Sequence, residues 1–459
     1  MFAPLVRWAL SVRPDEIPEK VALAARYQHV ASLGVLRTFR GTPRGQACLE
    51  GPMDLGGTAA LLFTNHDDYL LAGRSGLGAL PAVWANKSRT LHQAIADTVV
   101  ANEVAGRVGF AFANQHHPDA VDTRVAAVAS AIVRARVGSL SEAAALSLVE
   151  AAISGSTPSS PGEVASISGA RTVAHRVHSG PSSSGTAEPS YPGALGGLGV
   201  VWLTETLVLK RWPGTPWANV ALDGLNTILD RHLKAAEKRL RPDQLDRIEF
   251  FGPSQLLATE AAGSAITDRA GVAWSLSKAA ALLVGLHELS SAHLDFGAAG
   301  DKEPDILTLE PRVTVTHDWK LTTQQAVATS SQLGGVLGER GPMAFVKAGR
   351  GFTSGLPPVN AWVPMVNQKP WNILRFLREK GGLSSLSVSS APIFSFPIQV
   401  KLYTTRGGWW PERRANPSGW GNDMANVASL KHGDASAVES ALQADNLANL
   451  GGWMEGLLA

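Results

Sequence analysis

The stretch from Val121 to Gly155, VDTRVAAVASAIVRARVGSLSEAAALSLVEAAISG, carries two successive helical patterns. In its first half, apolar residues recur at intervals of four, three and four positions, at Val121, Val125, Val128 and Ile132. That spacing puts one apolar stripe along a helix, which is the pattern of a helix packed against a core. We expect this helix to end at Gly138.

A second helix should follow almost at once. Ser139 and Glu142 form a capping-box pattern, in which each side chain can bind a backbone N–H of the first turn. The expected apolar face consists of Leu146, Val149 and Ile153. Gly155 suits the C-terminal stop. Because the connection is short, the two helices should pack as antiparallel neighbours in a compact helical domain.

The segments before this stretch show the same periodicity. Pro18 suits a first helical turn, because its missing N–H would have no partner there in any case. The helix that follows should present one face made of Leu23, Tyr27, Val30 and Gly34. A further helix has its apolar residues at every fourth position, at Leu91, Ile95 and Val99. The first third of the chain is therefore predicted to be helical.

The character changes between residues 154 and 199, where Ser, Gly and Pro dominate and we predict a long loop. Beyond it, helices are expected at about 216–239 and 276–290. Apolar and polar residues alternate, as in strands, around Ile248 and Phe250, Val313 and Val315, and Ile398, Val400 and Leu402. This middle part fits a small antiparallel sheet with helices on one face. From about residue 415 the pattern is helical again.

Composition excludes several classes of protein. The 459 residues are 45% hydrophobic, which allows a large core, and 41 basic against 39 acidic residues leave a net charge of +2. Such a balance gives no field that would gather nucleic acid or an anionic membrane. The single cysteine, Cys48, predicts an inert loop thiol and no disulfide. No apolar run approaches the ~20 residues of a membrane span, so a cytoplasmic protein is expected.

Four segments, in this order, resemble the MmgE/PrpD family, whose members include 2-methylcitrate dehydratase and cis-aconitate decarboxylase. The segments are Ile17–Val35, Asp67-Asp68 with Ala79–Ala82, Glu103–Gly109 with His117-Pro118, and Leu209–Gly214. The resemblance covers most of the chain. It implies an all-α helical domain plus an α+β lid domain, a homodimer, and an active site between the two domains. It also implies action on a small carboxylate, with no metal and no cofactor.

In these terms the helical domain would span residues 1–196 and 405–459. The lid would span residues 197–404, with an insertion at about 321–396. The members of the family remove water, remove carbon dioxide or move a proton next to a carboxylate. Such reactions need a base near the C–H bond, an acid near the leaving group and cations for the carboxylates.

The family's site residues match this chain only in part. Asn65 stands where the family has an acid, Tyr69 where it has a threonine, and Ser75, beside Arg74, where it has a histidine. Asp67, Asp68 and Lys210 are kept. His175 and His178 match the family's Lys-x-hydrophobic-His segment, Asn219 stands at a further histidine position, and Lys278 falls near the lid tyrosine. Several residues that would act as general acids or bases in the family are therefore replaced in this chain.

Two functions follow from this partial match. The first is a cofactor-independent lyase or isomerase, in which His175 or His117 is the base, Asp68 orients it, and Lys210 with Arg74 holds the carboxylate. The remaining substrate-binding candidates are Asn65, Tyr69, Ser75, His178 and Lys278. The substrate would differ from methylcitrate and could be a biosynthetic intermediate with fewer carboxylates. The second is a ligand-binding or partner subunit that has lost its chemistry.

Each candidate also has a purely structural interpretation. Asp67 and Asp68 could cap a helix or pair with an arginine, and the histidines could make backbone hydrogen bonds. The Lys210 stem could simply cover Trp212. The tryptophans Trp409, Trp410 and Trp420 could form a platform for a sugar or a nucleic-acid base, but we favour their closing a joint between domains or a dimer interface.

Overall fold

The computed structural model describes residues 1–70, 73–112, 123–156, 158–179, 195, 198–199, 202–295, 303–318, 320–322, 324–325 and 396–459. Within these residues the protein is mostly helical, with one small sheet. The helices of the helical part are α1 (Ala3–Ser11), α2 (Glu19–Arg40), α3 (Pro43–Leu49), α4 (Met53–Thr64), α5 (Gly76–Trp84), α6 (Leu91–Ala111), α7 (Arg124–Val137), α8 (Glu142–Ser154), α9 (Pro161–Val164), α10 (Ile167–Ser179), α19 (Met424–His432), α20 (Ala435–Gln443) and α21 (Leu450–Leu458).

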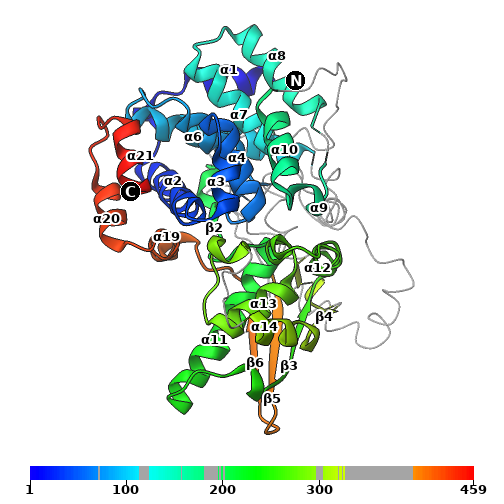
Figure 1. The fold of residues 1–459 in the computed structure, drawn as a ribbon. Coiled ribbons are helices and arrows are strands. Elements are labelled where there is room, and N and C mark those ends of the chain that lie inside the picture. Colours follow the sequence, from blue (N-terminus) through cyan, green and yellow to red (C-terminus); the bar gives the residue numbers. More distant parts are fainter. Residues whose placement is uncertain are drawn as a thin grey trace, which may run out of the picture.

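The helices around the sheet are α11 (Pro216–Ala236), α12 (Ser254–Ser264), α13 (Leu276–Leu286) and α14 (Glu303–Leu309). The strands are β1 (Asp68–Tyr69), β2 (Val208–Leu209), β3 (Leu245–Gly252), β4 (Val313–His317), β5 (Ile398–Thr404) and β6 (Trp409–Arg414). Short 3-10 helices include η4 (Leu203–Thr206) and η6 (Arg269–Ala273). Figure 1 shows the helical part above and the sheet with its helices below.

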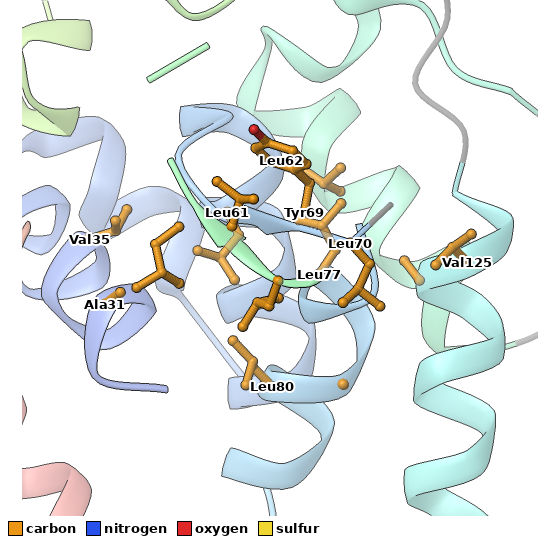
Figure 2. Packing of buried hydrophobic residues seen from close by; sticks show 14 of the residues in the cluster. Ala31, Val35, Leu61, Leu62, Tyr69, Leu70, Leu77, Leu80 and Val125 are labelled. Atoms are coloured by element: carbon orange, nitrogen blue, oxygen red, sulfur yellow. The ribbon is translucent and has the colours of Figure 1, made fainter. Parts of the chain in front are cut away.

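The helical core lies between α2, α4, α5 and α7. Figure 2 shows residues from these helices and from β1 meeting in one apolar cluster, with Val35, Leu61 and Leu77 among its labelled members. All three side chains are fully or almost fully buried. The periodicity of the opening stretch is confirmed, because Val125, Val128 and Ile132 are buried along α7.

The two ends of the chain are joined by helix packing. α19 packs along α2, and the two helices lie side by side in Figure 1. The close approach depends on Gly34, since a Cβ added there would lie 2.7 Å from the Cα of His432. α2 does not end near Gly34 and continues to Arg40. The glycine is therefore a contact point between helices, and it fixes where α19 lies.

The main sheet has the strand order β4-β3-β5-β6. β5 is antiparallel to both β3 and β6, as expected, but β4 is parallel to β3. The prediction of a purely antiparallel sheet was therefore wrong, and the sheet is mixed. One face is covered by α11 and α13, against which Ile248, Phe250 and Val400 are buried. The other face carries exposed Trp409, so among the described residues this tryptophan closes no joint.

A second, two-stranded sheet links the helical part to the segment that leads into α11. Asp68 pairs with Leu209 and Tyr69 with Val208. The segment before β2 is fixed by Glu103 of α6, whose carboxylate accepts the backbone N–H groups of Leu203 and Thr204 at 2.9 and 2.7 Å. Arg107 pairs with the same carboxylate at 2.7 Å. This buried ion pair determines where Lys210, the next residue after β2, enters the protein.

Several local predictions differ from the structure. The predicted loop over 154–199 contains α9 and α10, and His175 and His178 lie on α10 rather than in a loop. The N-cap of α8 is Ser141, which binds the N–H of Ala144, because Ser139 has a positive φ of 47°. Leu23 is exposed and leaves the predicted apolar face of α2. Cys48 is buried on α3, and burial raises the pKa of its thiol to about 12.

Two earlier predictions lie outside the described residues. These are the role of His117 and, for the most part, the insertion at 321–396. The division of the chain into two domains remains a prediction. β6 pairs with β5, so the sheet extends beyond residue 404, the predicted end of the lid, to Arg414.

We expect Gly34→Ala to destabilise the protein by about 1–3 kcal/mol, because the new methyl group must push the backbone of α19 away from α2. The matched control is Gly456→Ala near the end of α21, where an added Cβ meets nothing within 4 Å. That change should stabilise by ~0.5–1 kcal/mol through helix propensity. Urea unfolding of both variants measures the difference, and equal stability of the two would contradict the packing role of Gly34.

Candidate active site

The candidate site is built on the turn between α4 and β1. α4 ends at Thr64 and is capped by Asn65, which adopts the left-handed conformation (φ 45°) that asparagine tolerates better than most residues. Its amide nitrogen donates to the Ala273 carbonyl at 2.8 Å, so the turn is held against η6. The next residues, His66, Asp67 and Asp68, all point into the protein and are almost completely buried.

Asp67 lies at the centre of a buried ion cluster. Arg74 donates to both of its oxygens, at 2.8 and 2.5 Å, and Lys210 Nζ lies 2.8 Å from Oδ1. Lys210 also donates to the backbone and side-chain oxygens of Asn65, at 2.8 and 2.9 Å. Burial raises the pKa of Asp67, but the two cations outweigh it and hold that pKa at about 2. Asp67 is therefore permanently ionised at neutral pH.

Asp68 is adjacent in sequence but in a very different environment. It is fully buried, and within the described residues neither of its carboxyl oxygens has a hydrogen-bond partner. Its carboxyl lies against the Cα of Gly76, the first residue of α5, where any larger residue would overlap it. Burial and the charge of Asp67 raise the pKa of Asp68 to about 7, with Gln28, Lys431 and Lys210 opposing the shift.

A second buried lysine reaches the cluster from the other end of the chain. Lys431, on α19, donates to the His66 carbonyl at 2.7 Å and is 6% exposed. Burial lowers its pKa to about 8, against the opposing charges of Asp67 and Asp68. Burial likewise lowers the pKa of Lys210 to about 7. A carboxyl group and two ammonium groups can thus all exchange protons near neutral pH, which is typical of acid–base sites.

The structure brings together some of the predicted site residues. Asn65, Asp67, Asp68, Arg74 and Lys210 meet in the cluster, and Ser75 borders it through a hydrogen bond to Asn102. Tyr69 follows directly and packs its ring edge-on against Phe396.

Other predicted residues lie in separate surroundings. His178 is buried between Thr58 and Ser130, at 2.7 Å from each hydroxyl, and burial lowers its pKa to about 4. His175 is exposed on α10 and contacts Ser179. No described interaction links either histidine to the ion cluster. Lys278 donates to the Ile266 carbonyl, and Asn219 binds the backbone of Trp212.

Four residues of the site were missed at the level of sequence: Gln28, His66, Asn102 and Lys431. His66 could have been found, since it sits between Asn65 and Asp67 in the same turn. The others are brought in by helix packing and have no local signal of function. Burial lowers the pKa of His66 well below its ordinary value, so this imidazole is neutral.

Within the described residues, no group of three or more His, Cys, Asp or Glu side chains is arranged to hold a metal ion. None of the helices in that part of the chain combines the length and the apolar character that a bilayer span requires.

Compared with known proteins, the chain matches no family model, and no curated protein gives a significant match.

Asp68→Asn should make the protein more stable, increasingly so as the pH rises. An unfolded aspartate has a pKa of about 3.9, whereas burial raises that of Asp68 to about 7. Between these values the folded protein retains a proton that the unfolded chain has released, so ionisable Asp68 costs stability as the pH increases. The gain of the variant should grow by about 1.4 kcal/mol per pH unit from pH 4 to 7 and then level off.

Urea unfolding at pH 5, 6, 7 and 8 measures this trend. The matched comparison is Asp67→Asn, which removes an anion whose folded pKa is about 2, below its unfolded value. Asp67 therefore contributes stability above about pH 4, and its loss should destabilise the protein at all four pH values. If Asp68→Asn were destabilising by a constant amount at each pH, Asp68 would be an ordinary structural carboxylate.

Proposed function

We propose that the protein is a cofactor-independent lyase or isomerase that removes a proton next to a carboxylate or carbonyl of a small metabolite. The observation that carries this proposal is Asp68. It is a fully buried carboxyl whose oxygens have no hydrogen-bond partner within the described residues and whose pKa is raised to about 7. A base is most effective when its pKa lies near the working pH, so this group is suited to accept and return a proton.

The cations around Asp68 suit the anionic substrate that such a reaction needs. Within the described residues Lys431 donates one hydrogen bond, to a backbone carbonyl, and its ammonium has three donors. Arg74 is the most exposed member of the cluster, at 16% of its side chain, so a ligand would approach from its side. Together these two groups could hold a carboxylate and stabilise the enolate-like charge that forms when Asp68 takes the proton.

Lys210 has a different role in this scheme. Its ammonium is already engaged by Asp67 and by both oxygens of Asn65. It therefore fixes the turn that carries Asp68, and with a pKa of about 7 it is also a candidate acid for the leaving group. In a lyase the proton taken by Asp68 would be followed by loss of a group from the neighbouring carbon. In an isomerase a proton would return to the other face.

The resemblance to the MmgE/PrpD family supports the same class of reaction. We extend the proposal to a cytoplasmic homodimer that acts on a carboxylate other than methylcitrate in a biosynthetic tailoring step. His175, predicted from the resemblance as the base, is replaced by Asp68 in this proposal because His175 is exposed and bonded to Ser179.

A second candidate function is a catalytically degenerate subunit that binds a ligand. It is favoured by one observation: Asp67, Arg74 and Lys210 satisfy one another, and Asn65 contributes an amide to them. An amide cannot exchange a proton at ordinary pH. Because these side chains already satisfy one another's charges and hydrogen bonds, the cluster could serve only to bind a ligand or to stabilise the fold.

The two candidates separate in deuterium-exchange experiments. The purified protein is incubated in D2O with a panel of small di- and tricarboxylates, and proton NMR follows the loss of C–H signals. We expect exchange in at least one panel member. Asp68→Asn should slow that exchange by about 10²–10⁴-fold, the usual contribution of a general base.

His175→Ala decides between the two proposed bases. It should retain exchange if Asp68 is the base and lose it if His175 is. Loss in His175→Ala together with normal exchange in Asp68→Asn would sink our assignment. Calorimetric binding of a panel member without any exchange in the wild type would support the degenerate subunit instead.

A further inference from the structure

Three buried amide and hydroxyl side chains lead from α5 to Asp68. Ser75, just before α5, donates its hydroxyl to Oδ1 of Asn102 on α6 at 2.6 Å. Asn102 Nδ2 donates to Oε1 of Gln28 on α2 at 2.9 Å. All three side chains are fully buried. Gln28 faces the Asp68 carboxyl closely enough to lower its pKa, although the contact lies outside standard hydrogen-bond geometry.

The chain of hydrogen bonds has a direction. Asn102 accepts at its oxygen, so only its NH2 group is left for Gln28. Gln28 in turn uses its oxygen to accept, and only its NH2 group is left for Asp68. Within the described residues, neither Gln28 Nε2 nor the two Asp68 oxygens has another hydrogen-bond partner. A buried N–H donor without a partner is costly, and a buried carboxylate without one costs still more.

We infer that Ser75, Asn102 and Gln28 form a directional relay that aims an N–H group at the Asp68 carboxylate, which makes Gln28 a positioning residue for the base. The inference rests on the proposed function, since it assigns the relay to the group proposed as base. With the opposite polarity, Gln28 would present its oxygen, which suits a protonated carboxyl and repels an ionised one. The observed polarity therefore favours the form of Asp68 that can accept a proton.

The charged groups that face Asp68 are Asp67 from the same turn, Lys210 from the end of β2, and Lys431 from α19. The relay adds no charge to this set. Changing the relay by uncharged substitutions consequently leaves these groups in place and alters only the N–H offered to Asp68. A shift in the ionisation of Asp68 would then report the relay itself, whereas a merely structural role would leave it unchanged.

The test is an infrared titration of Asp68 in the full-length protein. The C=O stretch of the protonated carboxyl is followed against pH, with Asp68→Asn as the spectral reference. Gln28→Met, which keeps the length of the side chain but removes the N–H, should raise the midpoint by about one pH unit or more. Ser75→Ala should raise it by less, because Asn102 and Gln28 are then free to reverse.

Ser32→Ala is the matched control. Ser32 lies one turn after Gln28 on α2, is fully buried, and its hydroxyl has no hydrogen-bond partner within the described residues. It should leave the midpoint unchanged. Should Gln28→Met fail to fold, the pair Ser75→Ala and Ser32→Ala decides alone.

Unchanged midpoints in the relay variants would overturn the inference, as would an equal shift in Ser32→Ala. No substrate is needed for the titration, so its outcome is separate from that of the proposed catalysis. Unchanged midpoints together with deuterium exchange would rule out the relay but leave Asp68 as the proposed base. Shifted midpoints without any deuterium exchange would support the relay but contradict the proposed catalysis.

Discussion

The buried carboxylate of Asp67 is the constraint on which the site depends. It joins the turn after α4, the approach to α5 and the end of β2, because Arg74 and Lys210 both bind it. Removing one partner of a buried ion pair usually costs about 3–5 kcal/mol, since the other charge is left without compensation. The three segments are thereby held in one arrangement, and the neighbouring Asp68 is fixed in a fully buried position where, within the described residues, neither of its oxygens has a hydrogen bond of standard geometry.

The contrast between the two adjacent aspartates follows from this arrangement. Asp67 takes the direct contacts with cations, and its pKa falls to about 2. Asp68 is left with burial and with the repulsion of Asp67, and its pKa rises to about 7. Two carboxyls in one turn therefore differ in their ionisation: Asp67 is an anion that binds two cations, and the pKa of Asp68 lies near neutral pH. Such divergence is what acid–base chemistry requires of neighbouring groups.

Sequence reasoning found the parts of the site that are local and missed those made by packing. Asp67, Asp68 and Lys210 stand in short sequence segments that can be recognised, and the structure brings these residues together. Lys431 lies on α19, 403 positions after Gln28, and reaches the site because Gly34 lets α19 pack against α2. Gln28 lies on α2 and is placed by the packing of α2 against α6, where it accepts from Asn102. His178 was misplaced because Ser and Gly around it hid a helical repeat through Ala170, Val173 and Val177. The parallel pairing of β4 depends on a long connection that local alternation does not reveal.

The amide of Asn65 affects the charge balance of the cluster. Asp67 and Asp68 supply two negative charges when both are ionised, whereas Arg74, Lys210 and Lys431 supply three positive ones. An acid at position 65 would balance them, but the amide leaves a surplus of one positive charge in a buried place. Burial lowers the pKa of both lysines, because an ammonium group is costly to keep charged away from water. A bound carboxylate would balance this charge and raise both lysine pKa values again, so the amide at position 65 agrees with the anionic substrate proposed above.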